Sequence, residues 1–156
     1  MPKREVSKLK KLIISACLLG EPCRYDGKSK PCQDIQKLKG DYLFLPVCPE
    51  CMGGLPTPRP PAELQWDGRV VNREGIDVTA QYRKGAERVL EIAQREGCEI
   101  ALLKEKSPSC GKGMIYDGSF TGTLISGNGV CVDLLTQNGI KVFGESEIER
   151  LLEEKE

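Results

Sequence analysis

The 156-residue chain contains no histidine. Histidine is the side chain that most often moves protons near neutral pH, so an active site here has to use carboxyls, hydroxyls or thiols. A thiol nucleophile activated by histidine is excluded for the same reason. Aromatic residues make up only 5% of the chain, so stacking against a planar ligand falls to very few side chains, of which Tyr25 and Phe120 are the candidates.

Net charge and long apolar runs are also missing. The 23 basic residues balance the 23 acidic ones, which leaves no overall field to attract nucleic acid, and we expect no nucleic-acid partner. No apolar run approaches the length that spans a membrane, so we expect no membrane contact. The length fits one domain, 1–156, in which we interpret the basic residues of 1–10 as a solvated N-terminal tail.

Short apolar runs alternate with helical patterns along the chain, which is typical of an α/β fold. The pattern predicts buried strands at 11–16, 42–47, 99–103 and 140–143. Helices are expected at about 33–39, 79–97, 129–137 and 145–154, a small hairpin within 69–78, an irregular loop at 48–62, and a long loop at 104–128 with a short ribbon near Phe120. We therefore expect a small Rossmann-like domain of three layers, with a mostly parallel sheet and long loops at the carboxyl ends of its strands.

Eight cysteines are spread over this charged domain, which indicates free thiols in a reducing compartment and a cytoplasmic protein. Three of them, Cys17, Cys48 and Cys110, follow the ends of predicted strands. Because ligands of open α/β sheets bind beyond the carboxyl ends of the strands, these three can meet in one crevice. Thiolates are soft ligands that select zinc, copper(I) or iron–sulfur clusters, so the sequence predicts a metal site. Cys23 or Cys51 are alternative ligands.

The number of ligands decides what such a site can do. Cys48-x-x-Cys51 has a metal-binding spacing, but the chain has no second pair of this kind, as a structural zinc site would need. Three ligands leave a metal with an open position for a substrate, whereas a fourth closes it. Cys98 and Cys131 fall within or beside helical patterns, and we interpret them as small core residues.

Few groups near these cysteines can move protons. Glu50 comes two residues after Cys48 and would point back toward the same crevice if the chain leaves the strand in extended form. Ser107 and Ser109 supply hydroxyls next to Cys110. Glu50 is the best candidate for general acid–base work.

Six stretches of the chain follow, in order, the motifs of a known family. They are Ser15-Ala16-Cys17-Leu18-Leu19-Gly20, Cys23-Arg24-Tyr25-Asp26-Gly27, Cys48-Pro49-Glu50, Gly53-Gly54-Leu55-Pro56-Thr57-Pro58-Arg59, Lys106-Ser107-Pro108-Ser109-Cys110-Gly111 and Tyr116-Asp117-Gly118-Ser119-Phe120-Thr121-Gly122. Through them nearly the whole chain resembles the bacterial and archaeal family associated with thiouracil desulfidase, long catalogued as a domain of unknown function.

The resemblance implies a compact α/β domain in which three cysteines hold a [4Fe-4S] cluster with its fourth iron open. It also implies desulfuration of a small thiolated pyrimidine, a thiouracil-like base or nucleoside, to the oxo form with release of sulfide and no net redox change. Carried over by motif, the cluster ligands are Cys17, Cys48 and Cys110. Glu50 is then the acid–base group, and Ser107 is the hydroxyl that orients water or substrate, with Ser109 as the alternative.

Two other hypotheses remain open. A non-catalytic metal or cluster protein, acting in redox sensing or assembly, requires four cysteine ligands, and Cys51, which is outside the family pattern, would complete that set. A thiol enzyme with Cys48 as nucleophile is weaker because no histidine is present to activate it. The sequence also leaves open whether the substrate is a free base, a nucleoside or a modified RNA.

Overall fold

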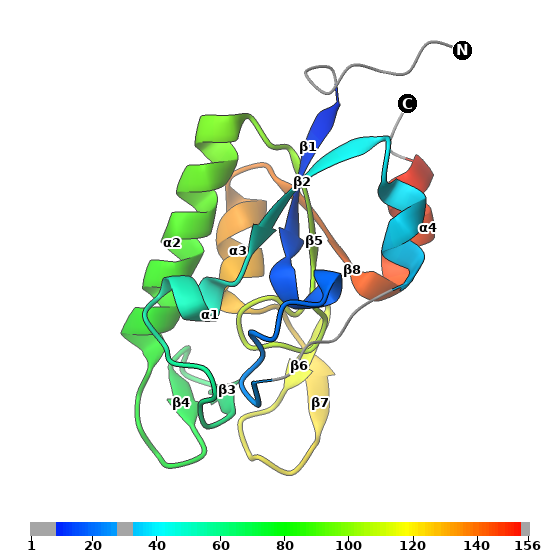
Figure 1. Ribbon diagram of the computed structural model, residues 1–156. Helices are drawn as coiled ribbons and strands as arrows, with labels where there is room; N and C mark the ends of the chain where they lie inside the picture. Colours follow the sequence, from blue (N-terminus) through cyan, green and yellow to red (C-terminus); the bar gives the residue numbers. More distant parts are fainter. Residues whose placement is uncertain (1–8, 28–32, 154–156) are drawn as a thin grey trace, which may run out of the picture.

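A four-stranded parallel sheet forms the centre of the computed structural model, which describes residues 9–27 and 33–153 (Figure 1). Its order is β2-β1-β5-β8, and every neighbouring pair is parallel. The strands are β1 (Lys10–Ser15), β2 (Tyr42–Val47), β5 (Ile100–Leu103) and β8 (Lys141–Gly144). All four were predicted. Cys32 and residues 1–8 of the expected tail lie outside the described residues.

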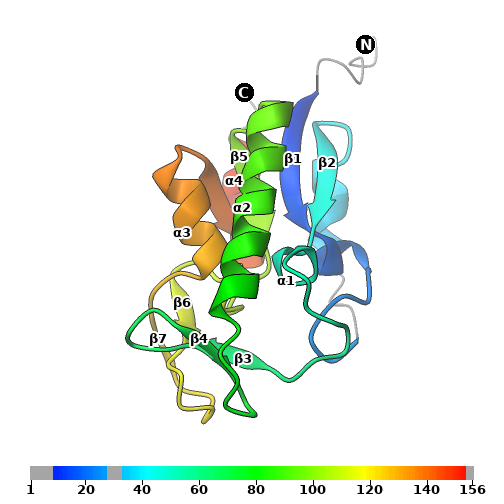
Figure 2. The same ribbon diagram turned by 90° about the vertical axis from the view of Figure 1, so that its left-hand side faces the viewer.

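Helices cover both faces of this sheet, which confirms the three-layer prediction (Figures 1 and 2). On one face lie α2 (Thr79–Glu96) and α3 (Val130–Gln137), and on the other lie α4 (Ile148–Glu153) and the 3-10 helix Gln33–Leu38. Strand β1 shows why both faces are apolar. Ile13 packs with the α2 and α3 side chains, while Leu12 and Ile14 pack on the opposite face, because successive strand residues alternate in direction.

One local prediction was wrong. The loop 48–62 begins with a short helix, α1 (Pro49–Met52), because Pro49 occupies the first helical position, where its missing N–H costs nothing. The hairpin expected within 69–78 is present in minimal form: Val71 forms an antiparallel bridge with Asp77, and the N–H groups of Asn72 and Val78 donate to the carbonyl oxygens of Ile76 and Val70. In addition, β4 (Val70–Asn72) pairs antiparallel with β3 (Ala62–Leu64), a strand that was not predicted. Strands of three residues are too short to show an alternating pattern in the sequence.

The ribbon expected near Phe120 is present as the antiparallel pair β6 (Met114–Tyr116) and β7 (Leu124–Ser126). Both ribbons lie beyond the carboxyl ends of the central strands, at the bottom of Figure 1. Within 145–154, a 3-10 helix at Glu145–Glu147 precedes α4. Cys98 and Cys131 are buried in the core, as expected.

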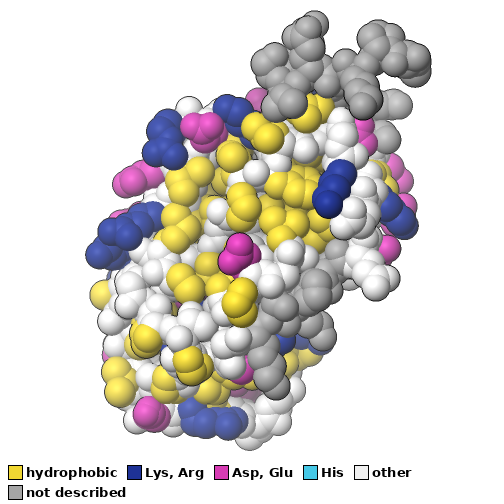
Figure 3. All heavy atoms as spheres, viewed as in Figure 1, with side chains coloured by type: hydrophobic (Ala, Val, Ile, Leu, Met, Phe, Trp, Pro, Cys, Tyr) yellow, Lys and Arg dark blue, Asp and Glu magenta, His cyan; other side chains and the backbone are white. Residues whose placement is uncertain are grey.

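Charged side chains of both signs are interspersed on the face shown in Figure 3, around a group of hydrophobic side chains near its middle. Among the described helices, none is both long enough and apolar enough to cross a membrane.

Candidate functional site

A pocket of about 500 Å³ opens where the carboxyl ends of β1, β2 and β5 meet the two ribbons. Its inner wall comes from residues that end or follow those strands: Ser15, Cys17, Val47, Cys48 and Lys104. Its outer wall comes from the ribbons and their loops: Glu63, Arg73, Tyr116 and Phe120. The pocket thus lies where the order of apolar strands predicted a ligand site.

Four cysteines line this pocket: Cys17, Cys23, Cys48 and Cys110. Cys17 is 7% exposed and Cys110 is 5% exposed. Burial raises the pKa of the Cys17 thiol to about 11 and raises the pKa values of Cys48 and Cys110 as well. Without a metal these sulfurs stay protonated, and a protonated Cys48 is a poor nucleophile. This observation weakens the hypothesis of a thiol enzyme.

Cys51 does not line the pocket, although it lies beside it. Its sulfur lies 3.4 Å from the Thr57 hydroxyl and accepts a long contact of 3.8 Å from the Arg59 guanidinium. Its thiol also donates to the carbonyl oxygen of Cys23 at 3.8 Å, as does that of Cys48. Cys51 is therefore near Cys48 in space, but it is not among the residues that line the cavity.

A single metal ion and an iron–sulfur cluster require different arrangements of cysteines. Within residues 9–27 and 33–153, no three cysteine or acidic side chains come close enough to share one metal ion. A zinc ion bound at about 2.3 Å from each sulfur requires that approach. In an iron–sulfur cluster the cysteines bind different irons, so their sulfurs stand further apart. The four cysteines that line the pocket are ligands of the kind that such a cluster takes.

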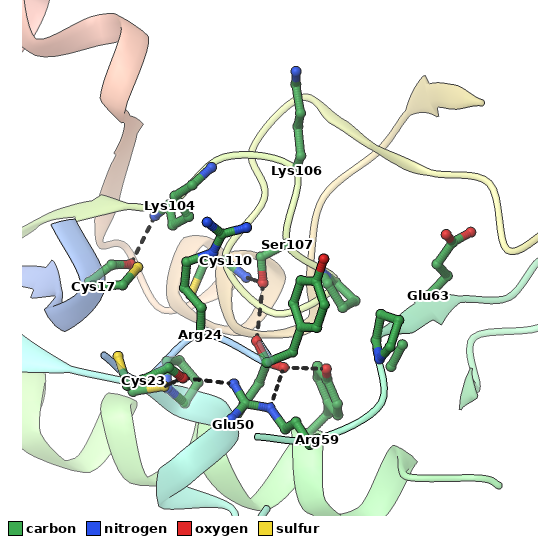
Figure 4. Close-up of a pocket in the computed structure, with 18 of the residues that line it drawn as sticks. Cys17, Cys23, Arg24, Glu50, Arg59, Glu63, Lys104, Lys106, Ser107 and Cys110 are labelled. Atoms are coloured by element: carbon green, nitrogen blue, oxygen red, sulfur yellow. Dashed lines mark hydrogen bonds and ion pairs between the residues drawn. The ribbon is translucent and has the colours of Figure 1, made fainter. Parts of the chain in front are cut away.

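Glu50 lies in the same pocket, but the backbone conformation that brings it there differs from the prediction. It belongs to the first turn of α1 rather than to an extended segment. Its Oε1 accepts a hydrogen bond from the Tyr82 hydroxyl at 2.6 Å and pairs with Arg59 Nε at 3.2 Å (Figure 4). Its Oε2 lies 3.5 Å from the Ser107 hydroxyl. One carboxylate oxygen is thus held by two donors, while the other faces Ser107.

Arg59 and Tyr82 were not predicted as site residues. The Arg59 side chain is only 3% exposed, and it also donates to the carbonyl oxygens of Cys23 and Pro56. Tyr82 is only 1% exposed, yet it lines the pocket and its hydroxyl reaches Glu50. The available sequence signal was the position of Arg59 at the end of the proline-rich motif. Tyr82 gave none.

The loop that carries Ser107 is fixed by its own backbone. The Ser107 hydroxyl oxygen accepts hydrogen bonds from the N–H groups of Ser109 and Cys110, at 3.0 and 3.1 Å. The carbonyl oxygens of Pro108 and Ser109 accept from the first N–H groups of α3. Ser107 lines the pocket, whereas Ser109 is fully buried and does not. Of the two serines, only Ser107 can face a ligand here.

The outer wall carries both aromatic candidates, Tyr25 and Phe120. Phe120 has a left-handed backbone, with φ of 60°, and its N–H donates to Glu63, as does the N–H of Gly118, at 3.1 and 3.0 Å. The guanidinium of Arg73 lies 5.8 Å from the Phe120 ring centre. Five basic side chains line the pocket: Arg24, Arg59, Arg73, Lys104 and Lys106.

Comparison with known proteins agrees with this geometry. The model of the 2-thiouracil desulfurase family matches residues 12–147. The solved structure of the [4Fe-4S]-dependent thiouracil desulfidase TudS superposes with a TM-score of 0.84 at 48% identity, covering 92% of this chain and 95% of that chain. The uncharacterized protein YbbK of Bacillus subtilis (strain 168) is 39% identical over 150 residues, 90% of this chain and 99% of its own length. The chain belongs to the 2-thiouracil desulfurase family.

Proposed function

We propose that this protein is a [4Fe-4S]-dependent desulfidase that converts a thiolated pyrimidine to its oxo form and releases sulfide. Family membership and the similarity to TudS support the reaction class. The observation that carries the proposal is the meeting of buried cysteines, Glu50 and Ser107 in one pocket of about 500 Å³. That combination offers soft ligands, a carboxylate and a hydroxyl within reach of one small molecule.

Cys17, Cys48 and Cys110 are the proposed cluster ligands. When bound, such a cluster supplies an iron with an open position, a Lewis acid suited to a soft thiocarbonyl sulfur. Cys51 does not line the pocket, which supports three ligands rather than four. Cys23 lines the pocket but is more exposed than Cys17.

The overall reaction needs water and no electron donor. The carbon–sulfur bond breaks, a carbon–oxygen bond forms from water, and the two protons of that water end on the released sulfide. We assign the proton transfer to Glu50, whose Oε2 faces the pocket beside Ser107. The Ser107 oxygen already accepts two N–H groups, and its proton is directed at Glu50 Oε2 over a long 3.5 Å, so it can turn to orient the attacking water or the substrate.

The substrate itself is proposed only as a thiolated pyrimidine base or nucleoside. The pocket volume falls within the range that holds drug-sized ligands, although cluster and substrate would share it. Tyr25 and Phe120 are the side chains that can lie against a pyrimidine ring. Thiouracil, thiouridine, its 5′-monophosphate and a thiolated RNA should be compared as substrates.

The test is turnover by protein purified without oxygen. We expect iron and acid-labile sulfide in the protein, and stoichiometric sulfide and oxo-pyrimidine from the substrate. Glu50→Gln should keep the iron and lower kcat by at least about 100-fold. Cluster-loaded protein that leaves every one of these thiolated pyrimidines unchanged would contradict the proposal.

A second experiment separates this function from a non-catalytic four-cysteine protein. Cys51→Ala should retain iron if three cysteines bind the cluster, and should lose it if Cys51 is a ligand. Cys110→Ala serves as the positive control, because we expect it to lose iron. Iron loss from Cys51→Ala, with inactive native protein, would favour the sensor or assembly hypothesis.

A further inference from the structure

Helix α1, which carries Glu50, lies directly against the backbone of α2. A Cβ atom added at Gly85 would overlap the carbonyl oxygen of Pro49, and one added at Gly53 would overlap the carbonyl oxygen of Gln81. Glycine inside a helix costs about 1 kcal/mol relative to alanine. At Gly85 the absence of a side chain is what permits this close approach of the two helices.

Tyr82 is three residues before Gly85, so both residues lie on the same face of α2. Because α1 rests on that face, the buried Tyr82 hydroxyl can donate to Glu50 Oε1 at 2.6 Å. Burial and the neighbouring Glu50 charge raise the pKa of Tyr82 well above its ordinary value. The hydroxyl therefore stays protonated and remains a donor.

The two oxygens of Glu50 are treated differently. Oε1 receives the Tyr82 hydroxyl and the Arg59 guanidinium, which together fix the plane of the carboxylate. Oε2 has only the Ser107 hydroxyl, at 3.5 Å, which is longer than an ordinary O–H···O hydrogen bond. Oε2 is the oxygen left available for a water or a substrate proton.

We propose that Tyr82 is a positioning residue for Glu50: together with the glycine contact at Gly85, it holds Oε1 so that Oε2 faces the reacting water. The inference rests on the proposed role of Glu50 in desulfuration. It gives α2 a part in the reaction, through an aromatic residue that is itself buried.

The test is Tyr82→Phe, which keeps the buried ring and removes only the hydroxyl. We expect kcat to fall about tenfold or more, with KM and iron content changed by less than about twofold. Tyr42→Phe is the matched control, because Tyr42 is also buried and its hydroxyl donates to the Leu151 carbonyl oxygen at 3.3 Å, away from the site. That variant should keep its kcat.

A double-mutant cycle distinguishes positioning from general destabilisation. In a Glu50→Gln background, Tyr82→Phe should lower kcat by less than about twofold further. A crystal structure of Tyr82→Phe should show the Glu50 carboxylate rotated from its native orientation. Equal losses in both backgrounds, or native kcat in Tyr82→Phe, would overturn the inference. Full activity of Glu50→Gln would instead overturn the role of Glu50 on which it rests.

Discussion

Replacing Arg59 by leucine should destabilise the fold far more than its place in a proline-rich loop suggests. The Arg59 side chain is 3% exposed and pairs with Glu50, which is 16% exposed. It also donates to Cys23 O at 3.0 Å, Pro56 O at 3.1 Å and Thr57 Oγ1 at 2.9 Å. Removing one partner of a buried ion pair costs about 3–5 kcal/mol, and the partial exposure of Glu50 favours the lower end. We expect a loss of about 3 kcal/mol in the free energy of unfolding.

The assay is urea unfolding of native and variant proteins with matched iron content. The midpoint should fall while the slope against urea stays constant, and the melting temperature should drop by roughly 6–12 °C for a chain of this size. Arg69→Leu is the control, because Arg69 pairs with Asp67 at a shorter 2.8 Å but is 56% exposed. It should unfold at the native midpoint. Equal losses in the two variants would refute the reasoning that burial, rather than distance, gives the Arg59 contacts their strength.

Two further predictions concern other carboxylates. Glu63→Ala removes the acceptor for the N–H groups of Gly118 and Phe120, so it should raise KM several-fold with little change in kcat, as measured by steady-state sulfide release. Burial alone would raise the pKa of Glu147, but the Gly144 N–H and the Lys112 ammonium outweigh it and hold the pKa below its ordinary 4.5. Its stabilisation is therefore present above about pH 4.5 and lost as the pH falls through the lowered pKa. The difference in unfolding free energy between native protein and Glu147→Gln should shrink accordingly in acid.

The convergence of Cys17, Cys48 and Cys110 on one pocket could be predicted from the sequence. Each follows a strongly apolar run, and parallel strands bring their carboxyl ends to one edge. Helix α1 could not be predicted, because its four residues are too few to show a helical periodicity in the sequence. Tyr82 could not be assigned to the site either, since its contact with Glu50 spans 32 residues and depends on how two helices approach each other. The sequence pattern within one helix does not show how that helix packs against another.

Helix α1 links the proposed cluster ligand to the proposed acid–base group. Cys48 is its N-cap and Glu50 lies in its first turn, so any shift of α1 moves both residues together. Gly85→Ala forces such a shift, because the added methyl group would overlap the Pro49 carbonyl oxygen. We expect this variant to lose iron during purification and to turn over slowly, whereas Tyr82→Phe should lose turnover alone.

Iron per chain and kcat per iron, measured on both variants, separate the two effects. Gly97→Ala is a poor control because Gly97 has a left-handed backbone, but Ala80→Gly alters an exposed position of the same helix and should change neither quantity. If Gly85→Ala keeps native iron content and native kcat, the helices tolerate separation without moving Cys48 or Glu50. The close contact of α1 with α2 would then contribute to packing without positioning the residues of the site.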